Sequence, residues 1–77
     1  MTNDALSKKI TNIMFREMGH IGIFITKKQC KDLGMDIDNI KKKDIPELAK
    51  SLGSVMSSFG GKQKKEQITK EILNLIN

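Results

Sequence analysis

The feature that most constrains the fold is a helical pattern over residues 44–61, DIPELAKSLGSVMSSFGG. Asp44 is a good N-cap, and Glu47, three residues later, can complete a capping box with it. Pro46 suits the first turn, where its missing N–H costs nothing, and the closing glycine pair favours a helix stop. One buried stripe is predicted between these signals, made of Ile45, Leu48, Ala49, Leu52, Val55, Met56 and Phe59.

Two other long segments carry similar signals. A helix is predicted over residues 4–18, capped by Thr2 or Asn3 and ended by Gly19. A last helix is predicted over residues 62–76. Their inner faces are expected to hold Leu6, Ile10, Ile13, Met14 and Met18 in the first case, and Ile68, Ile72, Leu75 and Ile76 in the second.

The segment HIGIFI, residues 20–25, admits three conformations. Its β-branched and aromatic content favours a strand, but the chain offers no second strand to satisfy its backbone groups. The alternatives are a buried helical continuation broken at Gly22, an extended link, and a strand that pairs with its copy in a dimer. We favour the first two together, and expect Ile21, Phe24 and Ile25 to be largely buried.

A short helix is expected next, over residues 27–33. Thr26 and Gln29 can form its capping box, and Gly34 is its stop. A brief helical turn should follow near residues 38–43. The inward-facing residues of this region are expected to be Cys30, Leu33, Met35, Ile37 and Ile40.

These elements predict an all-α fold in one domain over residues 1–77, a compact bundle of four helices of which one is short. The link Gly60–Gly61 is too short for anything but an antiparallel hairpin of the last two helices. A chain of 77 residues has a thin core, so a homodimer is a reasonable expectation.

Residues 26–43, TKKQCKDLGMDIDNIKKK, resemble a helix-turn-helix motif. The small residue Cys30 stands four positions before the turn glycine, Gly34, where two helices must cross closely. The apolar positions of the motif are filled by Leu33, Met35 and Ile40. The resemblance implies DNA binding, with the second helix in the major groove. A helical corner around a glycine, without such a role, is the alternative.

Charge adds a second argument for an anionic partner. The formal net charge is +5, from 14 Lys and Arg against 9 Asp and Glu. No aromatic residue is interleaved with the lysines of this region, so stacking on single-stranded bases is not expected. An ordinary solvated surface is the alternative interpretation. The nucleic-acid contacts predicted here are Lys27, Lys28, Lys31, Lys41, Lys42 and Lys43.

Candidates for catalysis or metal binding are few. The chain has one His and one Cys, whereas a metal site needs three or four clustered ligands. We therefore expect His20 to be a hydrogen-bonded structural residue, and we predict no catalytic residue, metal, cofactor or small-molecule substrate. The lone Cys30 cannot form an internal disulfide, and no apolar run is long enough to cross a bilayer. A cytoplasmic protein without membrane contact is the resulting prediction.

The function predicted first is a non-enzymatic, protein-interaction module that binds a protein partner or a second copy of itself. A chain this small cannot hide all its apolar residues, and Phe15, Ile23 and Leu73 are the predicted partner surface. For Phe15 and Leu73, which lie off the main stripes of their helices, a wider core face is the alternative. A basic nucleic-acid-binding protein, using the six lysines named above, is the alternative.

Overall fold

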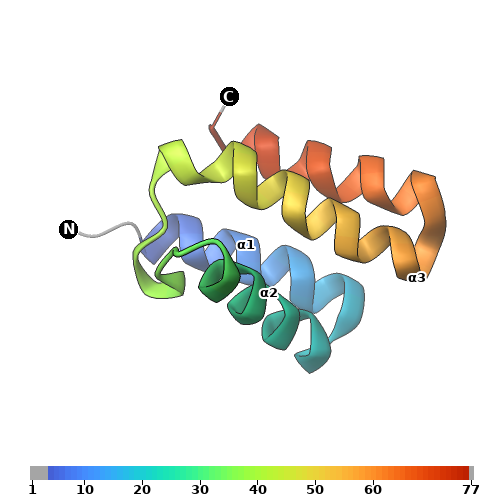
Figure 1. The fold of residues 1–77 in the computed structure, drawn as a ribbon, viewed down its shortest axis with the longest axis horizontal. Helices are drawn as coiled ribbons and strands as arrows, with labels where there is room; N and C mark the ends of the chain where they lie inside the picture. Colours follow the sequence, from blue (N-terminus) through green and yellow to red (C-terminus); the bar gives the residue numbers. More distant parts are fainter. Residues whose placement is uncertain (1–3, 77) are drawn as a thin grey trace.

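The computed structural model describes residues 4–76 and is all-α in that range, without a β-strand (Figure 1). The prediction of an all-α fold is confirmed, while the capping residues Thr2 and Asn3 lie outside the described residues. Short 3₁₀ turns separate or follow the main helices. The elements are α1 (Asp4–Met18), α2 (His20–Asp32), η1 (Ile37–Asn39), η2 (Lys42–Asp44), α3 (Ile45–Leu73) and η3 (Asn74–Ile76).

Helix α1 has the predicted bounds and the predicted inner face. Ile10 and Met14 are fully buried, and the other apolar residues of this face pack against the core. Gly19 ends the helix with φ 65°, and its N–H donates to the Phe15 carbonyl at 2.7 Å. Glycine adopts this backbone conformation without strain, so the chain turns directly into α2.

Helix α2 begins seven residues earlier than predicted, since it starts at His20 rather than at Lys27. Gly22 does not break it; this residue is buried within the helix, against the α1 backbone. Thr26 does not cap it either, because its hydroxyl donates to the Gly22 carbonyl at 2.8 Å inside the helix. The predicted break, extended link and capping box with Gln29 are therefore wrong.

Small residues determine which face of α2 turns inward. Gly22, Thr26 and Cys30 recur at intervals of four and are all buried. An added Cβ at Gly22 would lie 2.1 Å from the Met14 carbonyl oxygen, so only glycine allows α1 and α2 to approach this closely. Of the larger side chains expected inside, only Ile25 packs against the core, where it is partly buried. The expectation that Ile21 and Phe24 are buried is wrong, because both are exposed.

The C-terminus of α2 follows the prediction. Gly34 has φ 74°, and its N–H donates to the Lys31 carbonyl at 3.1 Å. The Met35 N–H donates to the Cys30 carbonyl at 2.7 Å. This pair of hydrogen bonds is the Schellman arrangement that ends many helices.

The second helix of the helix-turn-helix does not form. Residues 37–44 make two single 3₁₀ turns, η1 and η2, separated by Ile40 and Lys41 in an extended conformation. Ile40 is fully buried, and Ile37 packs against the core while its carbonyl accepts a hydrogen bond from Ser7 Oγ. The inward-facing apolar residues are thus confirmed, but the element that would enter a DNA groove is absent from this described segment.

Helix α3 starts at Ile45, with Pro46 in its first turn as predicted. The predicted capping box is wrong, because the Asp44 carboxylate accepts the Lys41 N–H at 3.1 Å and makes no side-chain cap to α3. Phe59 was expected inside, but it lies beyond the end of the core and is exposed. The rest of the stripe is buried or half-buried: Ile45, Leu48, Ala49, Leu52, Val55 and Met56.

A break at Gly61 divides α3 into two halves. Its φ of 73° and ψ of −163° are non-helical, and Figure 1 shows the chain turning back there so that the two halves lie side by side. Gly53 makes that approach close, since an added Cβ would lie 2.1 Å from Thr69 Oγ1. Ile68 and Ile72 of the second half are fully buried. The described chain has a radius of gyration of 11.1 Å.

Candidate interaction surface

Every phenylalanine in the chain lies at the surface. The chain has three Phe and no Trp or Tyr. Phe15, Phe24 and Phe59 are 47%, 77% and 59% exposed, and Ile21 is 60% exposed. The fully buried side chains are instead aliphatic or small, mainly Ile, Leu and Met. Aromatic residues are enriched at protein interfaces, so their exclusion from this core marks candidate contact residues.

Three of these exposed residues lie close in sequence to a connection between helical segments. The connection between α1 and α2 and the bend at Gly61 are both at the right-hand end in Figure 1. An ion pair joins the two regions, with Lys64 Nζ at 2.5 Å from Glu17 Oε1. Phe15 and Ile21 flank the connection, and Phe59 precedes the bend by two residues.

Helix α2 also contacts the first half of α3. Ser51 Oγ donates to Gln29 Oε1 at 2.6 Å, and Leu33 lines the same surface groove as Glu47. The hydrogen bond and the shared groove therefore hold the C-terminal half of α2 against the N-terminal part of α3.

We define the α2 outer face as Ile21, Phe24, Lys27, Lys28 and Lys31. All five side chains are exposed, and the last four line one hollow together with Asp32. Lys28 Nζ pairs with Asp32 Oδ2 at 3.1 Å. Within residues 4–76, neither Lys27 nor Lys31 has a carboxylate within 4.0 Å. The face therefore carries unpaired positive charge next to an exposed aromatic ring.

The other predicted lysines are placed elsewhere. Lys41, Lys42 and Lys43 are exposed in and beside η2, beyond the C-terminal end of α2. Two of the three line a hollow that also contains Asp36 and Asp44, so carboxylates are interspersed with them. The structure thus splits the six lysines into a basic helical face and a mixed-charge loop.

The predicted partner residues Phe15, Ile23 and Leu73 differ in their availability. Phe15 is exposed, and its ring contacts the His20 ring edge-on with centroids 5.3 Å apart. His20 is itself exposed, and its structural role is this ring contact rather than the hydrogen bond that was expected. Ile23 is half-buried. Leu73 is also half-buried and packs against the core.

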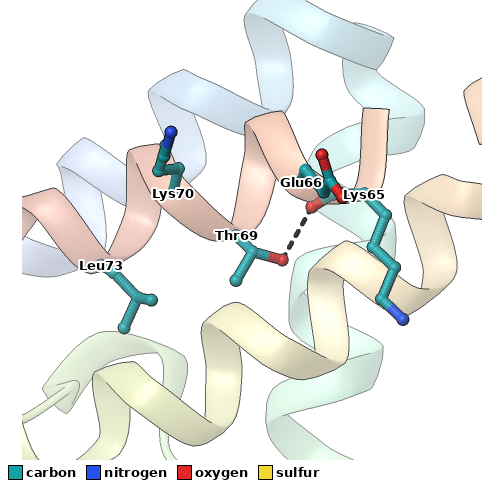
Figure 2. Close-up of a pocket in the computed structure, with 5 residues that line it drawn as sticks. All are labelled: Lys65, Glu66, Thr69, Lys70 and Leu73. Atoms are coloured by element: carbon teal, nitrogen blue, oxygen red, sulfur yellow. Dashed lines mark hydrogen bonds between the residues drawn. The ribbon is translucent and has the colours of Figure 1, made fainter. Parts of the chain in front are cut away.

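Leu73 also lines a hollow between the two halves of α3 (Figure 2). Leu73 and Thr69 point toward the first half of the helix, whereas Lys70 points away. The Thr69 hydroxyl already donates to the Lys65 carbonyl at 2.7 Å. The hollow therefore offers aliphatic surface and no uncommitted hydroxyl donor, which fits helix packing better than ligand recognition.

An ion-pair network joins α1 to the second half of α3. Arg16 Nη2 lies 2.5 Å from Glu71 Oε2 and 3.2 Å from Glu17 Oε2. The hydrogen bond from Lys64 holds the pKa of Glu17 below its usual range, although partial burial opposes this effect. Gln67 bridges the two carboxylates, at 3.1 Å from Glu71 and 3.5 Å from Glu17. The network therefore holds the C-terminal part of α1 against the second half of α3.

Neither the single thiol nor the acidic side chains of the described residues form a reactive or metal-binding site. Burial raises the pKa of the Cys30 thiol to about 11, so it remains protonated at neutral pH. The described residues contain no group of three or more His, Cys, Asp or Glu side chains placed to hold a metal ion. Over residues 4–76, no helix combines the length and apolar character needed to cross a bilayer.

The sequence interpretation missed Ile21, Phe24 and Phe59. A usable signal for the first two was present, because Gly22, Thr26 and Cys30 are spaced as one helical face of small residues. If that face packs inward, Phe24 must point outward. No comparable signal marks Phe59, which continues the buried stripe of α3 in spacing but extends past the core.

Comparison with known proteins adds no relative: no family model, curated protein or solved structure matches this chain.

Proposed function

We propose that the protein is a non-enzymatic interaction module that binds a protein partner through its exposed apolar residues. The observation that carries this proposal is the exposure of all three phenylalanines, together with Ile21, while every fully buried large side chain is aliphatic or Met. Isolated apolar residues on a surface are ordinary, but two large ones on one exposed helical face, Ile21 and Phe24, form a candidate binding surface.

The energetics favour a transient complex. Burial of a large apolar side chain contributes roughly 1.5–3 kcal/mol. Association itself costs about 4–15 kcal/mol, so four such residues roughly offset that cost and leave little surplus. Measurable affinity then depends on added polar or charged contacts, which the neighbouring lysines can supply.

The proposal includes a finer architecture and a location. The two halves of α3 form an antiparallel hairpin, and the chain behaves as a bundle of four helical segments. Support comes from the non-helical Gly61 and from Thr69 Oγ1, 3.5 Å from the Ala49 carbonyl of the other half. The single free cysteine supports a reducing, cytoplasmic environment.

Serine substitutions test the interaction function. Phe24→Ser and Phe59→Ser remove exposed rings, so each should change the free energy of unfolding by no more than about 0.5 kcal/mol. Each should nevertheless reduce the recovery of proteins crosslinked to the full chain in cells. Lys50→Ser, an exposed polar position away from both rings, is the matched control. Unchanged recovery with both phenylalanine variants contradicts the proposal.

Self-association is a distinct form of the same proposal. Sedimentation velocity of the full chain over a wide concentration range measures it directly. If the partner is a second copy, wild-type protein dimerises and Phe59→Ser shifts the equilibrium toward monomer. A monomer at all concentrations restricts the proposal to a different protein.

Nucleic-acid binding is the second candidate, and one observation favours it. No aromatic residue is interleaved with these lysines along the sequence, but in the fold Phe24 lies beside Lys27, Lys28 and Lys31 on one exposed face. A positive surface with an aromatic platform is typical of single-strand binding. Affinity for an oligothymidylate should then fall with salt, with a log–log slope of about −0.7 per phosphate contact. Absence of binding at low salt removes this candidate.

A further inference from the structure

We propose that the α2 outer face binds an acidic, amphipathic segment of a partner protein. In this complex, Ile21 and Phe24 cover the apolar side of the segment, and Lys27 and Lys31 pair with its carboxylates. The inference rests on the proposed interaction function and specifies the chemistry of the partner.

Charge is the first reason for an acidic occupant. The face presents three lysines, of which only Lys28 has a carboxylate partner, Asp32, within the described chain. Lys27 and Lys31 are one turn apart on the same side of the helix, so they repel each other. Like charges at this spacing cost an isolated helix a few tenths of a kcal/mol. Carboxylates on a bound segment remove that repulsion and form ion pairs in its place.

The apolar residues are the second reason. Phe24 lies one turn before Lys27 and Lys28 and two turns before Lys31, so its ring and the lysine stems line the same hollow. Lysine stems are themselves apolar, and they can cover a hydrophobic side chain while the ammonium group stays hydrated. A segment with both apolar anchors and carboxylates therefore matches this face better than a purely acidic chain.

The area of the face limits the size of the occupant. Helix α2 has 13 residues, so it is roughly 20 Å long and presents a strip about 10 Å wide. Such a strip offers a few hundred Å², below the ~800 Å² per partner of a typical interface between folded proteins. One helix laid along the strip can cover it, as in other complexes that recognise amphipathic helices.

A second copy of this chain is a poor occupant of the same face. Symmetric pairing of two α2 outer faces brings the lysines of one copy against those of the other. Like charges opposed across an interface disfavour association. The described surface therefore favours an acidic partner over self-pairing at this position.

A nuclear magnetic resonance titration of the full chain tests the proposal. The probe is a synthetic 14-residue helix with leucine at helical spacing and glutamate beside each leucine. A matched probe has glutamine at every glutamate position. We expect the acidic probe to shift the amide resonances of residues 21–31 more than those of residues 62–73. The glutamine probe should bind at least about fivefold more weakly, because two exposed ion pairs are lost.

Variants then separate the two kinds of contact. Phe24→Ala should weaken binding of the acidic probe without changing how steeply its affinity depends on salt. The double variant K27Q/K31Q should make the affinity less dependent on salt. The double variant K62Q/K70Q removes the same charge from exposed positions of α3 and should leave binding unchanged. Equal losses from the two double variants would show that only net charge matters, and would overturn the inference.

Two further probes distinguish other occupants. We expect neither an oligothymidylate nor vesicles containing phosphatidylserine to bind the α2 outer face more tightly than the acidic helix does. If either binds more tightly, the inference is wrong. If the acidic helix does not bind but Phe24→Ser and Phe59→Ser still reduce the recovery of crosslinked proteins, only the further inference is wrong. If these variants also leave the recovery unchanged, both proposals are wrong.

Discussion

Replacement of Gly22 by alanine should destabilise the protein, although alanine is the better helix former. In an exposed helix interior, this change gains roughly 1 kcal/mol. Here the new Cβ would lie 2.1 Å from the Met14 carbonyl oxygen and 2.6 Å from its carbonyl carbon. Ordinary van der Waals contact begins at 3.4 Å, so the Cβ and the oxygen would be more than 1 Å too close.

The cost follows from what must move. The obstructing atoms are backbone, so no side-chain rotation relieves the clash and α1 must separate from α2. Overpacking of this kind costs about 1–3 kcal/mol, and a backbone obstruction favours the upper part of that range. After the gain in helix propensity, the free energy of unfolding should fall by about 1–2 kcal/mol. For a domain of this size, the Tm falls by roughly 4–16 °C.

Urea denaturation followed by far-ultraviolet circular dichroism measures this change. Phe24→Ala is the matched comparison on the opposite face of the same helix. It removes a whole ring from an exposed position and should alter stability by no more than about 0.5 kcal/mol. If Gly22→Ala is instead more stable than the wild type by about 1 kcal/mol, the close packing of α1 on α2 is wrong.

Three further predictions follow from other parts of the structure. Gly61→Ala should lower stability by about 1–3 kcal/mol in a thermal melt, because the backbone at this bend is accessible almost only to glycine. The folded-state pKa of Glu17 is lowered, so its stabilisation is present above the pKa of the unfolded carboxyl group and is lost as pH falls through the folded value. Urea titrations across this acid range should therefore show a smaller loss for Glu17→Gln than for the wild type. The buried Cys30 thiol, with a pKa near 11, should react with a thiol reagent at neutral pH only after unfolding; fast reaction in native buffer contradicts its burial.

Local signals predicted the parts of the fold that depend on local chemistry. The bounds of α1, the stop at Gly34 and the first turn of α3 at Pro46 depend on backbone preferences of the residues themselves. Most of the predicted buried stripe of α3 is also inside, because its spacing defines one helical face. These features require no knowledge of what packs against them.

The orientation of α2 depends on a neighbour and was predicted wrongly. Apolar content alone suggested that Ile21 and Phe24 belong inside, but the contact of Gly22 with the Met14 backbone selects the small-residue face. The predicted cap at Asp44 failed for a related reason, since its carboxylate is engaged by the Lys41 N–H. Where two partners compete for one group, sequence spacing does not decide between them.

The candidate site was predicted in part for the same reason. Lysines were assigned to the surface correctly, because charged residues rarely bury. The aromatic ring that lies among three of them was assigned to the core. For Leu73, the sequence left both a partner surface and a wider core face open, and the residue packs against the core.

A single introduced tryptophan tests the central claim, the exposure of the phenylalanines, most directly. The chain has no tryptophan, so Phe24→Trp supplies one unambiguous fluorescence signal. In dilute native protein, we predict emission like that of a water-exposed indole and acrylamide quenching close to that of the urea-unfolded chain. A blue-shifted, protected emission that becomes red-shifted only on unfolding would place position 24 inside the protein and contradict the account.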